Sequence, residues 1–176
     1  MDRVLLALDG SDGAWRALAV AVDIAGRFDA ELVIAHVVID GEPDEEDLAS
    51  LRSQHPGLSA RLQPALERAA MGDDRDTLLC KQRGQAVGEF ATPRGLIGDS
   101  LLKEAEGVAR ASGVNRVRTI LIAGEPADTI LELAEMENIA LIVVGRRGLC
   151  GMGAILMESI STRIAQMAAQ NVLIVA

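Results

Sequence analysis

The sequence predicts a doubly wound α/β domain, in which helices cover both faces of a parallel sheet. Short, nearly continuous apolar runs alternate with longer segments whose apolar residues recur at helical spacing. The apolar runs suit strands that are covered on both faces, and the alternation indicates repeated strand–helix units. We expect five parallel strands, at 3–8, 31–38, 116–122, 139–144 and 171–176.

Four helices are expected between these strands. The segment 11–27 spaces Ala14, Leu18 and Ala21 for one apolar face, and its Ser11 can cap the first orphan amides. Similar patterns predict helices at about 95–111, 126–137 and 159–168. Pro126 suits a helix start, where its missing N–H costs nothing.

The stretch 40–94 breaks this rhythm and is expected to be an insertion in a single domain that covers 1–176. Five carboxylates stand within residues 42–47, and prolines further along interrupt any regular pattern: Glu42, Asp44, Glu45, Glu46, Asp47, Pro56, Pro64 and Pro93. A broken helix at 58–71 and a hairpin at 77–90 are possible within it. A solvated acidic excursion is the favoured reading, with a lid or a partner site as the alternatives.

Composition excludes several classes of function. Lys and Arg number 17 against 26 Asp and Glu, and only three residues are aromatic, which argues against non-specific nucleic-acid binding. Cys80 and Cys150 lack metal-ligand spacing, so a structural zinc site is not expected. The chain enters a strand pattern at once and has no apolar run near the roughly 20 residues of a membrane span. We expect a cytoplasmic protein with reduced thiols and no membrane partner.

Two motifs follow expected strands, where open parallel sheets bind ligands. In LDGSDG, Asp9 can accept hydrogen bonds from a ribose or base edge, or it can organise the turn. No G-x-G-x-x-G follows the first strand, which argues against a hydride-transferring enzyme. His36, near the end of the second strand, is interpreted as a core or turn residue and not as a catalyst.

The second motif is the glycine-rich loop that begins at Gly145. Its glycines would let backbone N–H groups approach a phosphate, next to a helix start, and Arg146 and Arg147 add positive charge. The alternative is a strand-to-helix connector whose glycines supply positive φ angles.

The spacing in this loop favours the first interpretation. From Gly145 the sequence reads G-R-R-G, then nine residues, then Glu158-Ser159, which resembles the G-x2-G-x9-G-(S/T) signature of the universal stress protein family. The segments RVLLALDGSDGAWRALAVAVDIA, ELVIAHVV, GEPADTILELAEMENIALIVVGRRG and NVLIVA resemble other parts of that family. The resemblance covers essentially everything outside 40–94.

The resemblance implies a Rossmann-like sheet of strand order 3-2-1-4-5 and a site for an adenine nucleotide, ATP or AMP, with Mg²⁺. In nucleotide-binding members, the positions that match Asp9 and Val37 lie near adenosine. Those that line the ribose and phosphates match Gly145, Arg147, Gly148, Ser159 and Ile160. The resemblance also implies a homodimer paired through the last strand, NVLIVA, which begins at Asn171 and ends at Ala176.

Glu158 departs from the signature, because it stands in the place of the last motif glycine. A carboxylate about 4 Å from a phosphate charge would cost on the order of 4 kcal/mol at an effective dielectric of about 20. Arg146, Arg147 or Mg²⁺ could offset this repulsion, the side chain could swing away, or it could occupy the anion site itself.

Two functions of different class therefore remain. The first is an adenine-nucleotide-binding regulatory protein of the stress response, without turnover. The alternative is a dimeric interaction protein whose phosphate site Glu158 blocks. An enzyme is not favoured, because the sequence has no Walker motif and no recognisable set of nucleophile, base and orienting residue.

Overall fold

A computed structural model describes residues 1–39, 93–146 and 160–176 of the chain. Its sheet has five parallel strands in the order β3-β2-β1-β4-β5, which confirms the predicted fold class and order. The strands are β1 (Arg3–Ala7), β2 (Glu31–Val38), β3 (Val117–Ala123), β4 (Leu141–Gly145) and β5 (Asn171–Val175). The order reverses between β1 and β4, so this pair forms the switch point of the sheet.

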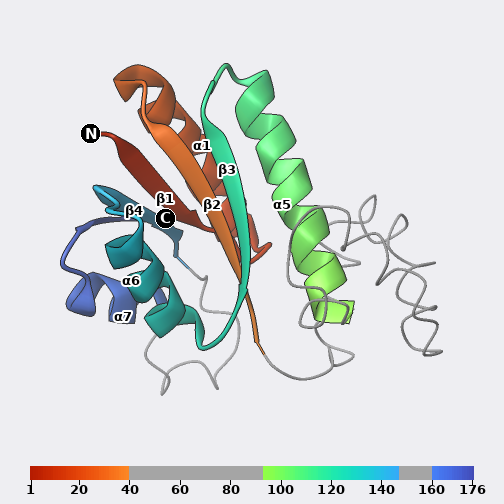
Figure 1. Cartoon of the computed structure of the whole chain (residues 1–176), viewed down its shortest axis with the longest axis vertical. Helices are drawn as coiled ribbons and strands as arrows, with labels where there is room; N and C mark the ends of the chain where they lie inside the picture. Colours follow the sequence, from red (N-terminus) through yellow and green to blue (C-terminus); the bar gives the residue numbers. More distant parts are fainter. Residues whose placement is uncertain (40–92, 147–159) are drawn as a thin grey trace.

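The described helices pack on both faces of the sheet. They are α1 (Asp12–Phe28), α5 (Pro93–Ala111), α6 (Pro126–Met136) and α7 (Ile160–Met167). One apolar cluster joins the sheet to α1 and α5, and a second joins it to α6 and α7. Figure 1 shows α6 and α7 together on one side of the strands and α5 running along β3.

Helix α1 illustrates how local sequence positions these elements. The hydroxyl of Ser11 accepts a hydrogen bond from the amide of Ala14, so the predicted cap is present. The buried face of α1 is built largely from alanines, which let the helix lie close to β1 and β4. Asp29 ends the helix in the left-handed region, with φ of 47°.

The predicted boundaries need correction at several ends. Pro93 and Arg94 were assigned to the insertion, but α5 begins at Pro93. Proline is tolerated there because a first-turn residue needs no intrahelical N–H bond. Leu8 follows β1 and does not end it, although its amide still donates to the carbonyl of Ala35 over 2.8 Å. The helix at 58–71 and the hairpin at 77–90 lie outside the described residues.

Candidate functional site

The carboxyl edge of the sheet brings the two sequence motifs onto neighbouring strands. Ala7 of β1 is paired in register with Val144 of β4. Asp9 therefore follows one central strand by two residues, while Gly145 ends the other. The predicted juxtaposition of Asp9 and the start of the Gly145 loop at the switch point is present.

The Asp9 side chain organises the turn between β1 and α1. Its Oδ1 atom accepts hydrogen bonds from the amide of Ser11 over 3.0 Å and from the Ser11 hydroxyl over 2.6 Å. Gly10, between them, has a φ of +84°, a region that L side chains rarely adopt. The turn-organising role is thus observed, and Asp9 remains exposed at this edge.

Gly145 is required by a close approach of two backbones. A Cβ atom on Gly145 would lie 2.3 Å from the carbonyl carbon of Gly13, and one on Gly13 would lie 2.7 Å from the carbonyl oxygen of Arg146. The expectation that a connector would need glycine for positive φ is wrong at Gly145, because the positive-φ glycines among the described residues are others. The end of β4 is therefore held against the first turn of α1.

Gly13 was not singled out from the sequence. A glycine in a first helical turn gives no signal of its own, because its partner is more than a hundred residues away along the chain. Only the strand order that places β4 beside β1 makes this glycine necessary.

Two further candidate residues lie on the α6 and α7 face of the sheet. Val37 of β2 and Ile160, the first residue of α7, are half-buried and pack against the same apolar cluster as Ala7. The predicted site residues Arg147, Gly148 and Ser159, together with Glu158, lie outside the described residues.

An arginine ties together the starts of α6 and α7. The Nη2 atom of Arg163 contacts both carboxylate oxygens of Asp128, at 2.7 and 2.9 Å, and its Nη1 lies 3.5 Å from Glu125. Glu125 also caps α6 by accepting from the Asp128 amide over 3.0 Å. This cluster, which the sequence analysis missed, fixes the helix that begins at Ile160.

His36 lies on the other face of β2, toward α5. Its Nδ1 atom is 2.7 Å from the carbonyl oxygen of Leu8. Burial lowers the pKa of the imidazole, while the hydrogen bond to Leu8 and the charge of Asp9 act in the opposite direction. The interpretation of His36 as a bonded core residue agrees with this geometry.

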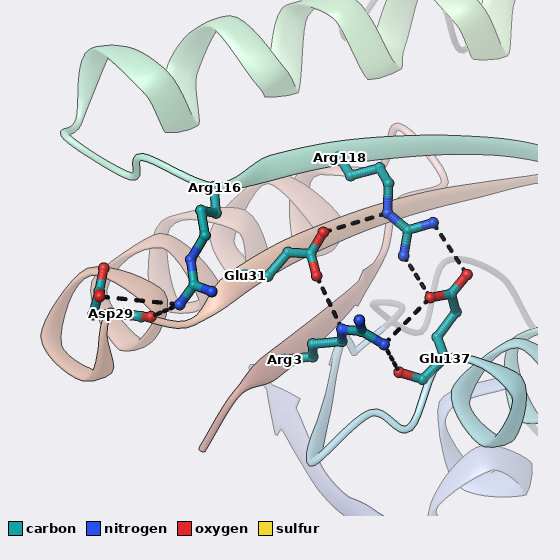
Figure 2. A network of polar contacts seen from close by, with 6 residues as sticks. All are labelled: Arg3, Asp29, Glu31, Arg116, Arg118 and Glu137. Carbon is teal, nitrogen blue, oxygen red and sulfur yellow. Dashed lines mark hydrogen bonds and ion pairs between the residues drawn. The ribbon is translucent and has the colours of Figure 1, made fainter.

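The amino edge of the sheet carries a closed set of ion pairs, drawn in Figure 2. Arg3 of β1 pairs with Glu31 of β2 at 2.9 Å, and Arg118 of β3 pairs with Glu137, after α6, at 2.6 Å. Arg118 also reaches Glu31 at 3.5 Å, and Arg3 donates to the Glu137 carbonyl over 2.6 Å. The bonds from Arg118 are the main reason that the pKa of Glu137 is lowered.

Within residues 1–39, 93–146 and 160–176, no group of three or more His, Cys, Asp or Glu side chains is arranged to hold a metal ion. No helix in the same ranges is long and apolar enough to cross a membrane.

Comparison with known protein families identifies the family to which the chain belongs. The model of the universal stress protein family matches residues 1–176. The chain belongs to the universal stress protein family. It is 31% identical over 172 residues to a universal stress protein of Thermus aquaticus, encoded 3′ of a QAH/OAS sulfhydrylase, with 98% of this chain and 96% of the relative covered. It is 27% identical over 174 residues to the Bacillus subtilis universal stress protein YxiE, with 99% and 98% covered.

Solved structures of universal stress proteins share the fold of this one. One, a complex with cAMP, matches with a TM-score of 0.63 at 23% identity and covers 99% of this chain and 97% of that one. The Lactobacillus plantarum protein UspA matches with a TM-score of 0.60 at 21% identity, with 99% and 97% covered. These likenesses establish the five-stranded fold.

Proposed function

We propose that this universal stress protein binds an adenine nucleotide at the switch point between β1 and β4 and acts through binding, without turnover. The observation that carries the proposal is the placement of Asp9 and Gly145 at the ends of two paired central strands. Ligands of open parallel sheets bind at this position. A universal stress protein of the same fold was solved with cAMP.

Each predicted contact has a place in this proposal. Asp9 and Val37 would lie beside adenosine, with Val37 presenting an apolar surface from β2. Gly145, Arg147, Gly148, Ser159 and Ile160 would line the ribose and phosphates. The Arg163 cluster supports this end of the site, because it holds the first turn of α7 against α6.

Mg²⁺ would enter with ATP, bound through its phosphates. The described ranges contain no three-ligand cluster for a metal. Magnesium commonly keeps several waters and binds through substrate phosphates, with few protein ligands. We place this activity in the cytoplasm, where Cys80 and Cys150 would stay reduced.

The charge of Glu158 determines which nucleotide is favoured. It replaces the last motif glycine, and its repulsion rises with the number of phosphate charges nearby. Nucleotides with a single phosphate, AMP or cAMP, should therefore be penalised less than ATP. If the repulsion is not offset, the second candidate function follows: an interaction protein that has lost nucleotide binding.

Calorimetric titration of nucleotide-stripped protein tests the proposal. Wild type, Glu158→Gly and the charge-only control Glu158→Gln would each be titrated with ATP and Mg²⁺, AMP and cAMP. We expect wild type to bind and both variants to gain affinity for ATP more than for cAMP. The gain for ATP should be on the order of a thousandfold, the equivalent of roughly 4 kcal/mol for one phosphate charge about 4 Å away.

The outcomes separate the two functions. Equal affinity of all three proteins for ATP would show that Glu158 does not face the phosphates. If neither wild type nor Glu158→Gly binds any of the three nucleotides up to millimolar concentration, nucleotide binding is overturned and the interaction protein is favoured. Mass spectrometry of protein before stripping would detect retained nucleotide.

We also propose that the protein forms a homodimer through β5. This strand ends the sheet order, with β4 as its described neighbour, and Ile174 exposes 39% of its surface there. An apolar edge strand is a template for pairing with a second copy. Light scattering should give twice the chain mass, and Ile174→Lys should give the monomer. A monomeric wild type would contradict the proposal.

A further inference from the structure

His36 lies directly beneath the Asp9 turn, on the face of the sheet opposite Val37. Along β2, Ile34 packs with the α1 and α5 cluster, whereas Ala35 and Val37 pack with the α6 and α7 cluster. The alternation of side chains places the imidazole on the α5 side. The imidazole therefore lies on the opposite face of the sheet from Val37 of the candidate site.

The imidazole fixes the backbone from which Asp9 projects. Because a carbonyl oxygen only accepts, the 2.7 Å contact with Leu8 requires that Nδ1 carries a hydrogen. The amide of Leu8 donates to the carbonyl of Ala35 over 2.8 Å. Both backbone polar groups of Leu8 are thus bonded to β2, and the next residue is Asp9.

Helix α5 packs against both the imidazole and the Asp9 turn. A Cβ atom on Gly98 would lie 2.5 Å from Cδ2 of His36 and 3.0 Å from Nε2. A Cβ atom on Gly10 would lie 3.0 Å from the side chain of Leu101. Movement of the ring is therefore restricted by the same helix that contacts the Asp9 turn.

We propose that His36 is a positioning residue for nucleotide recognition, which holds the Asp9 turn through the Leu8 carbonyl, and that its neutral form is the one that binds nucleotide tightly. The inference rests on the proposed function, because Asp9 is one of the adenosine contacts in that proposal. It extends the site to a residue on the opposite face of the sheet.

Protonation of His36 would disturb this arrangement. A second N–H would appear at Nε2, the edge that faces the backbone of α5 at Gly98. Burial opposes the charge and lowers the pKa, while the bond to Leu8 and the charge of Asp9 favour it. An imidazolium would draw the Asp9 carboxylate toward it and away from Ser11.

Three charged groups of α5 have partners of their own. On α5, Asp99 pairs with Lys103, and Arg94 donates to the carbonyl of Ile39 over 3.5 Å. On β3, the residue that shares the space around Gly98 is the apolar Leu121. Asp9 is the carboxylate whose charge acts on the imidazole, and nucleotide affinity should fall as the pH drops through the pKa of His36, which burial places below the ordinary histidine value of 6.5.

The test uses cAMP as the probe, because its phosphodiester does not change charge between about pH 5 and 8, where histidine titrates. Wild type, His36→Asn and His36→Leu would be titrated calorimetrically across this range. Asparagine places an amide N–H near the position of Nδ1 but cannot be protonated. Leucine removes the donor.

We expect the affinity of wild type to fall on the order of tenfold toward acid, the equivalent of a one-unit difference in pKa between the free and bound states. His36→Asn should keep the neutral-pH affinity and lose the pH dependence. His36→Leu should bind more weakly at every pH. Equal cAMP binding by all three proteins, or a wild-type affinity that does not change with pH, would overturn the proposal.

A nucleotide-free measurement separates this inference from the proposed function. NMR spectra of the stripped protein should show the Asp9, Gly10 and Ser11 amides following the titration of the His36 ring. If wild type fails to bind cAMP, these amides still decide whether His36 positions the turn. Amide shifts that do not change with the ring titration would overturn the positioning role. If His36→Leu does not fold, His36→Asn still tests that role.

Discussion

The two edges of the sheet are built from different chemistry. At the amino edge, two arginines and two glutamates from three strands and the end of α6 neutralise one another (Figure 2). Around the switch point at the carboxyl edge, the contacts come from short side chains and close backbones: Asp9, Gly10, Ser11, Gly13 and Gly145. Long charged side chains hold the strand starts together, whereas small residues leave backbone within reach of a ligand.

The two edges contribute to stability in different ways. The side chains of the amino-edge ion pairs are between 24% and 40% exposed, so solvent screens them and each pair contributes modestly. The carboxyl edge depends on backbone contacts that no larger residue can replace. Substitutions at the two edges should therefore differ in size and in what they affect.

The largest effect is expected from Gly145→Ala. Its Cβ would meet the Gly13 carbonyl carbon at 2.3 Å and the Ala14 amide nitrogen at 2.5 Å, and neither backbone atom can move without shifting α1. We expect a loss of about 3 kcal/mol in the free energy of unfolding, measured by chemical denaturation. The new methyl group would also disturb the switch point.

Gly107→Ala is the matched control, because nothing lies within 4 Å of a Cβ at this position in α5. The same chemical change should stabilise the protein there by about 0.5 to 1 kcal/mol, the usual helical advantage of alanine. Similar effects at the two glycines would show that the contact between Gly13 and Gly145 is not tight.

A smaller effect is expected at the amino edge from Glu137→Gln, about 1 kcal/mol because the pairs are partly exposed. The pKa of Glu137 is lowered from 4.5, chiefly by hydrogen bonds from Arg118. Its contribution is therefore complete above that ordinary value and is lost as the pH falls through the lowered one. Denaturation at several pH values should show a smaller acid loss in Glu137→Gln, and nucleotide affinity should not change.

The control for Glu137→Gln is Asp99→Asn, which removes an exposed i,i+4 pair with Lys103 on α5. Its effect should stay below about 0.5 kcal/mol. If Asp99→Asn lowered the free energy of unfolding as much as Glu137→Gln, the four charges at the amino edge would contribute no more than separate surface pairs. Added salt should reduce the difference between wild type and Glu137→Gln.

Local sequence patterns were sufficient to predict which segments form strands and helices. The apolar run at 31–38 became β2 with both of its predicted ends, and Ser11 became the cap of α1. The predicted start of α5 was wrong, because a proline that follows an irregular stretch can equally begin a helix, as Pro93 does. The order 3-2-1-4-5 came from the family resemblance, since periodicity does not say which strands are neighbours.

The sequence by itself determined where strands and helices form and which strand ends carry the candidate motifs, because these depend on neighbours within a few turns of the chain. The tertiary structure alone decided that Gly13 meets Gly145, that Arg163 reaches Asp128, and that His36 reaches the carbonyl of Leu8. The physical reason is separation: the partners of His36 and Arg163 lie 28 and 35 residues away, and Arg3 bonds across 134. Such contacts exist only once the folded sheet brings the two partners of each contact together.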